Sequence, residues 1–545
     1  MSLENENRSS PKINPFLPFI FGLLLAIGVA IGYFISNRVK NNVFSNYTLL
    51  NTGNKMNSIV DYILQNYVDT INKKDLEDEA ITSMLHSLDP HSDYIPASEF
   101  QQINEPLQGN FEGIGVEFNI FNDTITVVTP ISGGPSEKAG ILAGDKIIYV
   151  EKEKVSGVKI TNKLVFSKLR GKKGTKVKIS VLRNGNKKLY DFTITRGEIP
   201  LYSVDVSYMI RPNIGYIKVS RFAKTTYEEF IQACKTLQRK GMKKMILDLR
   251  GNPGGILPAA VNICDEFLSK GYTIVYTEGK ASPKNIHKST STGGFENGEI
   301  VVLIDEGSAS ASEIIAGALQ DNDRATIIGR RSFGKGLVQE QMDLEDGSAI
   351  RLTVARYYTP TGRCIQKPYS ENKEEYYEEE YKRLENGELF SADSIKFADS
   401  LKFTTPGGKT VYGGGGIMPD VFIPIDTTER SSYLSKIVNS GLLSSFAFMY
   451  ADKNRANLLK YGSPEQFVKN FSLNETVFNE FLSFLETKGV QKEANGIRKS
   501  GNLLKNQLAA LIGRAIYNNE AFYPVINGRD KAIMRAVETL SKQKK

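Results

Sequence analysis

A run of small residues that presents three serines is the segment of this chain best suited to chemistry. It spans residues 307–313 and has the sequence Gly-Ser-Ala-Ser-Ala-Ser-Glu. A serine hydroxyl attacks a carbonyl effectively only when a neighbouring base takes its proton. Lys335 follows between two glycines, and a lysine can act as that base when burial lowers its pKa toward neutrality. A serine nucleophile with a lysine base is typical of a peptidase.

Histidine, the more usual base, is scarce in this chain. The three histidines are His86, His91 and His287, and none lies near the serine run in sequence. Gln339 follows Lys335 by four residues, a spacing that places both side chains on one face of a strand or of a helical turn. We therefore expect Gln339 to orient the lysine amine through a hydrogen bond.

The serine run is expected to form the turn between a strand and a helix. The apolar block at residues 301–304 predicts a buried strand before it, and residues 313–320 predict a helix after it. The first N–H groups of a helix have no partner within the helix. We therefore expect the Ala311 N–H to form one half of an oxyanion hole.

A glycine-rich segment is expected to supply the other half. Residues 248–255, Asp-Leu-Arg-Gly-Asn-Pro-Gly-Gly, follow a strand-like run that begins at Met245. Paired glycines allow the backbone to approach a substrate carbonyl closely, so Gly254 and Gly255 are both candidate donors. Taken singly, each motif is more often structural, because Ser/Ala runs pack helices and Asn-Pro-Gly-Gly is an ordinary turn. Their joint presence favours a catalytic site.

The same lysine also lies in a near match to a phosphate-binding loop. Residues 329–336, Gly-Arg-Arg-Ser-Phe-Gly-Lys-Gly, follow an apolar strand-like run. The match fails at Gly336, where Ser or Thr should hold the magnesium, and residues 337–344 lack the pattern of a long helix. Nucleotide binding is therefore disfavoured, and no metal or cofactor is expected.

From about Phe44 to Pro424 the chain resembles the carboxy-terminal processing peptidases, also called tail-specific proteases. The resemblance rests on separate motifs, at residues 88–94 (Leu-Asp-Pro-His-Ser-Asp-Tyr), 111–116, 248–255, 358–363 and 411–417, in addition to the serine run. These serine peptidases carry a Ser/Lys dyad and an embedded PDZ domain. The resemblance implies that Ser310 is the nucleophile, Lys335 the base and Gln339 its support, and that Ser308 and Ser312 are structural. Residue types alone do not choose among the three serines.

Residues 104–197 are predicted to form the PDZ domain. Residues 124–128 alternate as a strand does, and residues 176–182 and 188–195 predict a hairpin joined through Asn184-Gly185. A PDZ domain binds a peptide as an added strand and holds its terminal carboxylate on backbone N–H groups. The candidate groups here are those of Ile114, Gly115 and Val116, although a glycine-rich turn in a small β-domain would give the same pattern.

Length, charge and cysteine content limit the classes of protein to which the chain can belong. A chain of 545 residues is long enough for several domains, and a net charge of +8 is mild for that length. The lysines between residues 168 and 178 predict a solvated face, with attraction of an anionic peptide end as the alternative. They lack interleaved aromatic residues, so no nucleic-acid partner is expected. The cysteines, Cys234, Cys264 and Cys364, predict no disulfide framework, and the first two are expected in the core.

Residues 16–36 are predicted to be a transmembrane anchor that follows an N-terminal tail, residues 1–15. Phe16 to Ile35 is an apolar run of twenty uncharged residues, and about 20 are needed to span a bilayer. A cleaved signal peptide would have a shorter apolar core and a small-residue cleavage site, which Ile35-Ser36-Asn37-Arg38 does not clearly offer. The resemblance implies a single-pass inner- or plasma-membrane protein whose catalytic part is periplasmic or otherwise extracytoplasmic.

The predicted fold class is an α/β catalytic core of layered sheet and helices with an inserted β-rich PDZ domain. The core is placed at residues 198–426 and is preceded by a helical region at 44–103, which packs on it or mediates homo-oligomerisation. An acidic insert at 371–388 is expected to be a solvated helix or loop. Residues 427–545 predict a helical extension whose role is left open among a cap, a partner surface and packing on the core.

The sequence therefore predicts a serine endopeptidase that captures the free C-terminus of a protein or peptide and cleaves near it through an acyl-enzyme. The alternative is a non-catalytic PDZ scaffold that binds peptides. The presence of Ser310, Lys335 and Gln339 together argues against that alternative, because a scaffold has no need of all three.

Overall fold

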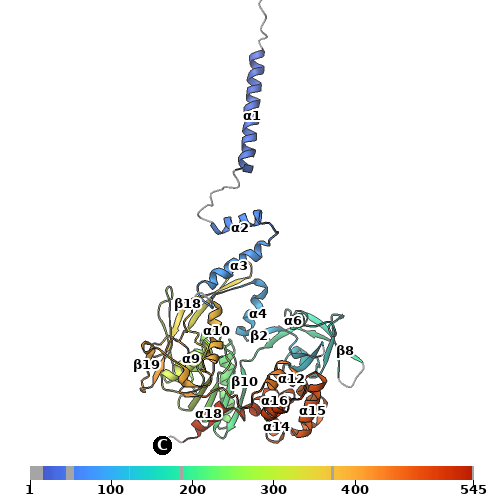
Figure 1. Cartoon of the computed structure of the whole chain (residues 1–545), viewed down its shortest axis with the longest axis vertical. Coiled ribbons are helices and arrows are strands. Elements are labelled where there is room, and N and C mark those ends of the chain that lie inside the picture. The colour runs from blue at the N-terminus through green and yellow to red at the C-terminus, as the bar shows by residue number, and fades with distance from the viewer. Residues whose placement is uncertain are drawn as a thin grey trace, which may run out of the picture. The chain divides into compact units, whose positions relative to one another are not determined.

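The computed structural model describes residues 16–43, 55–121, 123–183, 188–291, 293–369 and 373–542. The chain divides into two compact units, Met1–Ser83 and Met84–Lys545. The first unit contains α1 (Leu17–Val43) and α2 (Lys55–Asn66), and α3 (Lys73–His86) crosses the boundary (Figure 1). Within the described ranges, one helical stretch, Pro18–Ser36 in α1, is long and apolar enough to cross a membrane, a property that signal sequences share.

The centre of the second unit is a sheet with the order β10-β11-β12-β15-β16-β21. Its strands are β10 (Val204–Arg211), β11 (Ile214–Val219), β12 (Lys244–Asp248), β15 (Glu299–Ile304), β16 (Thr326–Gly329) and β21 (Val421–Phe422). Neighbouring strands are parallel except for β10 and β11. Strands covered on both faces have to be apolar throughout, which explains the uninterrupted apolar blocks in the sequence.

Helices cover the two faces of this sheet. One face packs against α7 (Thr226–Arg239), α8 (Leu257–Asp265) and α9 (Ala311–Asp321), and the buried Cys234 and Cys264 lie in that layer as expected. The other face packs against α18 (Lys531–Ser541), the last helix of the chain. The result is an α/β sandwich.

A second sheet lies beside the sandwich and includes a strand that the sequence did not predict. Its order is β1-β18-β13-β14, and β17 pairs with β18. These strands are β1 (Asp93–Ile95), β13 (Thr273–Glu278), β14 (Asn285–Lys288), β17 (Leu337–Asp343) and β18 (Ala349–Tyr358). The expectation of a purely helical segment before the PDZ domain was therefore wrong at β1, because pairing with β18 overrides the local pattern. Helix α4 (Ala97–Gln108) follows β1.

The PDZ part is a sheet with the order β3-β4-β5-β7-β8, to which β6 (Glu153–Lys154) adds beside β5. Its strands are β3 (Val116–Phe121), β4 (Thr124–Pro130), β5 (Lys146–Val150), β7 (Lys176–Leu182) and β8 (Leu189–Thr195), with helices α5 (Pro135–Lys138) and α6 (Asn162–Leu169). Strands β2 (Asn110–Gly113) and β9 (Gly197–Pro200) pair where the chain enters and leaves this part. The predicted β7–β8 hairpin is present, and its Asn184-Gly185 turn lies outside the described residues.

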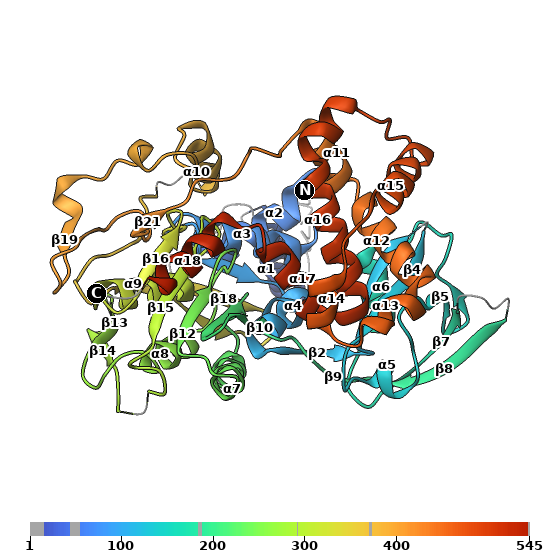
Figure 2. The same ribbon diagram turned by 90° about the horizontal axis from the view of Figure 1, so that it is seen from below.

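The C-terminal region is helical and has an apolar core of its own. It contains α11 (Ser432–Asn439), α12 (Leu442–Lys453), α13 (Arg455–Leu458), α14 (Pro464–Asn470), α15 (Glu475–Thr487), α16 (Ala494–Tyr517), α17 (Asn519–Asn527) and α18. Asn474 caps α15 by accepting the Val477 N–H, as predicted. Of the three roles left open by the sequence, packing on the core is the one that α17 and α18 fulfil (Figure 2).

The position of α18 leads to a stability prediction. Ile533 is 1% exposed against the central sheet, whereas its neighbour Met534 is 49% exposed. Ile533→Ala should lower the free energy of unfolding by roughly 2–4 kcal/mol, since it leaves a cavity against the sheet. Met534→Ala should change it by less than about 0.5 kcal/mol. Denaturant unfolding of both variants measures the difference, and equal effects would contradict the packing of α18 on the sheet.

Candidate functional site

The predicted dyad residues line one cleft of the second unit. Ser310, Lys335 and Gln339 border a cavity of about 430 Å³. The remaining walls are largely apolar and include Leu107, Ile256, Leu257, Ile314, Leu337, Val338 and Tyr357. The structure thus brings together side chains from α9, from the segment before β17, and from β17 itself.

Ser310 is held in a strained backbone conformation at the start of α9. It follows the loop after β15 and has φ 52° and ψ −112°. A positive φ is costly for a residue with a Cβ and persists only where the surroundings impose it. Here the Ser310 N–H donates to Glu313 Oε2 at 2.8 Å. This turn places the side chain at the cleft, where the residue is partly exposed.

Lys335 and Gln339 meet as the spacing predicted, with β17 beginning between them. Lys335 Nζ donates to Gln339 Oε1 at 3.0 Å, and Gln339 Nε2 donates to the carbonyl of His91. Burial lowers the pKa of Lys335, and the charge of Arg351 lowers it further. Between the described residues, no hydrogen bond joins the Ser310 hydroxyl to the Lys335 amine.

The two glycines of the segment 248–255 differ in what their N–H groups do. A Cβ on Gly254 would lie 2.7 Å from Ser310 Cβ and 3.0 Å from the Ala311 nitrogen, so only glycine permits this approach. The Gly254 N–H itself donates to Asn252 Oδ1 at 2.9 Å. Gly255 borders the cleft. In the described part of the chain, the N–H groups of Gly255 and Ala311 have no hydrogen-bond partner.

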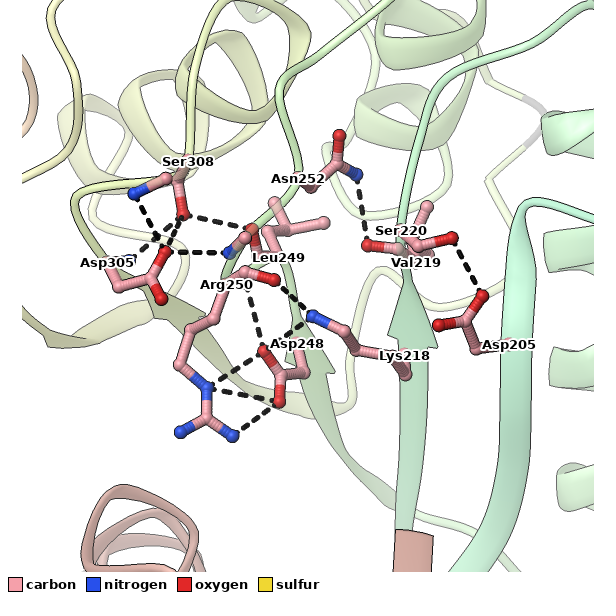
Figure 3. Close-up of polar contacts among 12 residues, drawn as sticks. Asp205, Lys218, Val219, Ser220, Asp248, Leu249, Arg250, Asn252, Asp305 and Ser308 are labelled. Atoms are coloured by element: carbon pink, nitrogen blue, oxygen red, sulfur yellow. Dashed lines mark hydrogen bonds and ion pairs between the residues drawn. The ribbon is translucent and has the colours of Figure 1, made fainter. Parts of the chain in front are cut away.

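A polar network fixes the two loops that carry these groups (Figure 3). Ser308 Oγ donates to the Leu249 carbonyl at 2.9 Å, and Asn252 Nδ2 donates to the Val219 carbonyl at 3.0 Å. Ser312 Oγ donates to the Asn252 carbonyl at 2.9 Å. Ser308 and Ser312 are thus engaged with backbone carbonyls, and both side chains are buried.

A buried ion-pair cluster underlies the same loop. Arg250 Nη2 lies 2.6 Å from Asp248 Oδ2, and Lys218 Nζ lies 3.4 Å from Asp248 Oδ1 (Figure 3). Burial would raise the pKa of Asp248, but the charges of Arg250 and Lys218 outweigh it and hold the pKa below its ordinary value. Asp248 therefore stays ionised and anchors the start of the glycine-rich segment 248–255.

Glu313 is a residue of this site that sequence reasoning missed. Its side chain is fully buried and accepts hydrogen bonds from the Ser310, Gly334 and Lys335 N–H groups and from the Ser332 hydroxyl. Burial raises the pKa of Glu313 to about 7, and these donors, which favour the anion, oppose that rise. The Ser-x-x-Glu spacing of a helix capping box was the signal that could have revealed it.

Helix α10 (Lys373–Glu385) supports the segment that carries Lys335, and this corrects one expectation. Tyr376 is 3% exposed, and its hydroxyl lies 2.9 Å from His91 Nε2. Arg383 is also buried and donates to the Ser332 carbonyl at 2.8 Å. The acidic insert is therefore not simply solvated, because one face of its helix packs beside the site.

The predicted peptide-binding residues lie where β3 begins, at an edge of the PDZ sheet. Gly115 has φ 74°, and its carbonyl accepts the Ile131 N–H at 3.0 Å. Ile114 is buried, and its carbonyl accepts the Ser136 N–H at 3.0 Å. Further along β3, Phe118 packs edge-on against Phe166 of α6, with ring centroids 5.8 Å apart. Strand β3 and helix α6 are therefore neighbours at one edge of the PDZ sheet.

Across the described ranges, no group of three or more His, Cys, Asp and Glu side chains is arranged to hold a metal ion.

Comparison with known proteins gives three domain matches. Peptidase family S41 matches residues 213–373, a PDZ domain matches residues 113–194, and a family of unknown function matches residues 433–518. A carboxy-terminal-processing protease of Bartonella bacilliformis is 39% identical over 317 residues, which are 57% of this chain and 72% of that protein.

Two proteins of Bacillus subtilis are similar over a comparable stretch. The carboxy-terminal processing protease CtpA is 38% identical over 314 residues, which are 57% of this chain and 66% of CtpA. CtpB is 36% identical over 316 residues, which are 57% of this chain and 65% of CtpB.

The buried carboxylate of Glu313 leads to a prediction. In Glu313→Gln, an amide NH₂ replaces one of the two carboxylate oxygens. An NH₂ group cannot accept the hydrogen bonds that this oxygen accepts now, so the site should lose them. The free energy of unfolding should fall by roughly 2–4 kcal/mol. Glu340→Gln, at an exposed position of β17, is the matched control and should be near neutral. Denaturant unfolding compares the two variants. An unchanged free energy of unfolding in Glu313→Gln would show that the carboxylate does not hold the site.

Proposed function

The chain belongs to the carboxy-terminal processing protease family, and we propose that it cleaves protein substrates with Ser310 as nucleophile and Lys335 as base. It is a serine-type peptidase with a PDZ domain. The single observation that best supports the dyad is the placement of Ser310, Lys335 and Gln339 on one cleft, with the lysine pKa lowered.

In the proposed reaction, the neutral Lys335 amine takes the proton of the Ser310 hydroxyl as its oxygen attacks the scissile carbonyl. The C–N bond breaks, the amine leaves with a proton from Lys335, and an acyl-enzyme remains. Water then attacks the ester by the same route and releases the carboxylic acid. Gln339 orients the amine, because its amide is itself held by the His91 carbonyl.

The oxyanion is proposed to bind the N–H groups of Ala311 and Gly255. Both are free to donate within the part of the chain that the structure describes, whereas the Gly254 N–H donates to Asn252. Of the two glycines, Gly254 is therefore assigned to the close approach between loops and Gly255 to the oxyanion. Donors of this kind stabilise the charge that develops in the transition state.

Lys335 Nζ donates to Gln339, and within the described residues it makes no hydrogen bond with Ser310, so proton transfer requires the amine to come within hydrogen-bond reach of the Ser310 hydroxyl. We propose that a bound substrate favours that arrangement, which is a shift between two populated states. Substrate capture is proposed at the β3 edge, where an extended C-terminus adds as a strand and Ile114, Gly115 and Val116 hold its carboxylate.

The first test is cleavage of an unstructured polypeptide with an apolar C-terminal residue. Ser310→Ala and Lys335→Ala should each lower kcat/KM by at least roughly a thousandfold. Lys335→Arg should be equally inactive, because a guanidinium keeps its proton and cannot serve as base. All three should still bind the C-terminal peptide. A fully active Lys335→Ala would reject the dyad.

The same substrate with an amidated C-terminus tests capture by the PDZ domain. Amidation removes the carboxylate, so KM should rise while cleavage within a saturated complex remains. If wild type and Ser310→Ala both bind the tail and neither cleaves it, the non-catalytic scaffold becomes the better description.

We also propose that α1 anchors the chain in a membrane with the catalytic part outside the cytoplasm. The support is the length and apolarity of Pro18–Ser36. The full chain should remain in the membrane pellet after alkaline carbonate washing, whereas residues 41–545 should be soluble. A mature N-terminus downstream of residue 36, found by intact mass, would instead identify α1 as a cleaved signal sequence.

A further inference from the structure

Arg351 is a charged residue at the cleft that the proposed mechanism does not use. It borders the same cavity as Ser310, Lys335 and Gln339. It lies on β18, where it is paired in register with Gln341 of β17 on one side and with Asp93 of β1 on the other. It is therefore held in the interior of the second sheet, and its side chain is partly buried.

The guanidinium of Arg351 is held by neutral groups. Its Nε donates to Gln341 Oε1 at 3.2 Å, and its Nη2 donates to Asn104 Oδ1 at 2.8 Å. Among the described residues, no carboxylate lies within 4.0 Å of this guanidinium. Burial lowers the pKa of Arg351, and the charge of Asp93, its cross-strand neighbour on β1, opposes that fall. A guanidinium keeps its proton, so Arg351 carries a positive charge beside the cleft with no carboxylate of the described residues in contact.

The pairing of β17 with β18 places the Arg351 side chain on the sheet face that carries Gln339, the hydrogen-bond partner of Lys335. Gln339 is paired with Thr353 and Gln341 with Arg351, and residues two apart on a strand share a face. Gln339 accepts from Lys335 Nζ, so Arg351 and the lysine amine lie on the same side of the sheet. Arg356, also on β18, is exposed and does not border the cavity.

Two carboxylates also face Lys335, and both are engaged by neutral donors. Asp89, in the segment before β1, accepts from the His91 and Ser92 N–H groups and from the hydroxyls of Ser92 and Thr353. Glu313, on α9, accepts from backbone N–H groups and the Ser332 hydroxyl as described above. Neither makes an ion pair with the lysine or with Arg351 within the described residues.

We propose that Arg351 is a positioning residue whose unpaired guanidinium disfavours protonation of the Lys335 amine and so keeps the base ready for Ser310. This role rests on the dyad proposed above. Its physical basis is like-charge repulsion in a partly buried cleft, which destabilises a second cation. Burial and then Arg351 lower the pKa of Lys335, while Asp89 and Glu313 act in the opposite direction.

The test is the pH dependence of kcat/KM in the full chain. A base works when neutral, so activity should rise with pH through the pKa of Lys335. Removing the neighbouring cation raises that pKa, so Arg351→Gln should move the acid limb to higher pH by roughly 0.5–1 unit. Activity should recover at high pH. Arg351→Lys keeps the charge and should stay near wild type.

Arg356→Gln removes an exposed cation of the same strand that does not border the cavity, and it is the matched control, with no expected shift. The Arg351→Gln shift should shrink at high salt, since screening weakens the repulsion. An unchanged acid limb in a folded Arg351→Gln would overturn the proposal, as would a raised KM with no shift, which would instead indicate contact with substrate. An active Lys335→Ala would reject the dyad itself, whatever Arg351 does.

Discussion

Ser310 and Lys335 belong to different elements, and the buried carboxylate of Glu313 holds their backbones together. One oxygen accepts the N–H of both Ser310 and Lys335, while the other accepts from Ser332 and Gly334. A carboxylate without a counter-ion is stable in the interior only when its donors are all in place. The residue that donates one of these N–H groups, Ser310, has a positive φ of 52°.

The central sheet fixes the positions of the loops that carry the glycine pair and the serine run. Strands β12 and β15 are parallel neighbours, so the loops at their carboxyl ends, which carry the glycine pair and the serine run, emerge side by side. Contacts such as Ala309 N–H to the Asn252 carbonyl, at 3.0 Å, then join the two loops. The other face of these strands packs against α18, so this helix covers part of the peptidase core.

Local patterns predicted the central strands, the helix after the serine run, the PDZ-type strands and the contact between Lys335 and Gln339. They could not predict β1, because a three-residue strand is defined by its partner β18 and not by its own sequence. Glu313 was missed because its four donors converge only in the folded chain. His91 contributes a backbone carbonyl, and residue type does not predict such a contact. The burial of Tyr376 depends on tertiary packing, which the acidic sequence around it does not predict.

The helical extension contacts both elements that the proposed mechanism uses. Arg514 pairs with Glu117 at 3.0 Å and Phe448 stacks on Phe121, and both partners lie on β3, the strand proposed to receive the peptide. At its other end, Asp530 pairs with Arg250 of the glycine-rich segment 248–255 at 2.8 Å. A displacement of β3 toward or away from the core therefore has to strain or break contacts of this region. The extension therefore contacts both the PDZ sheet and the loop that follows β12.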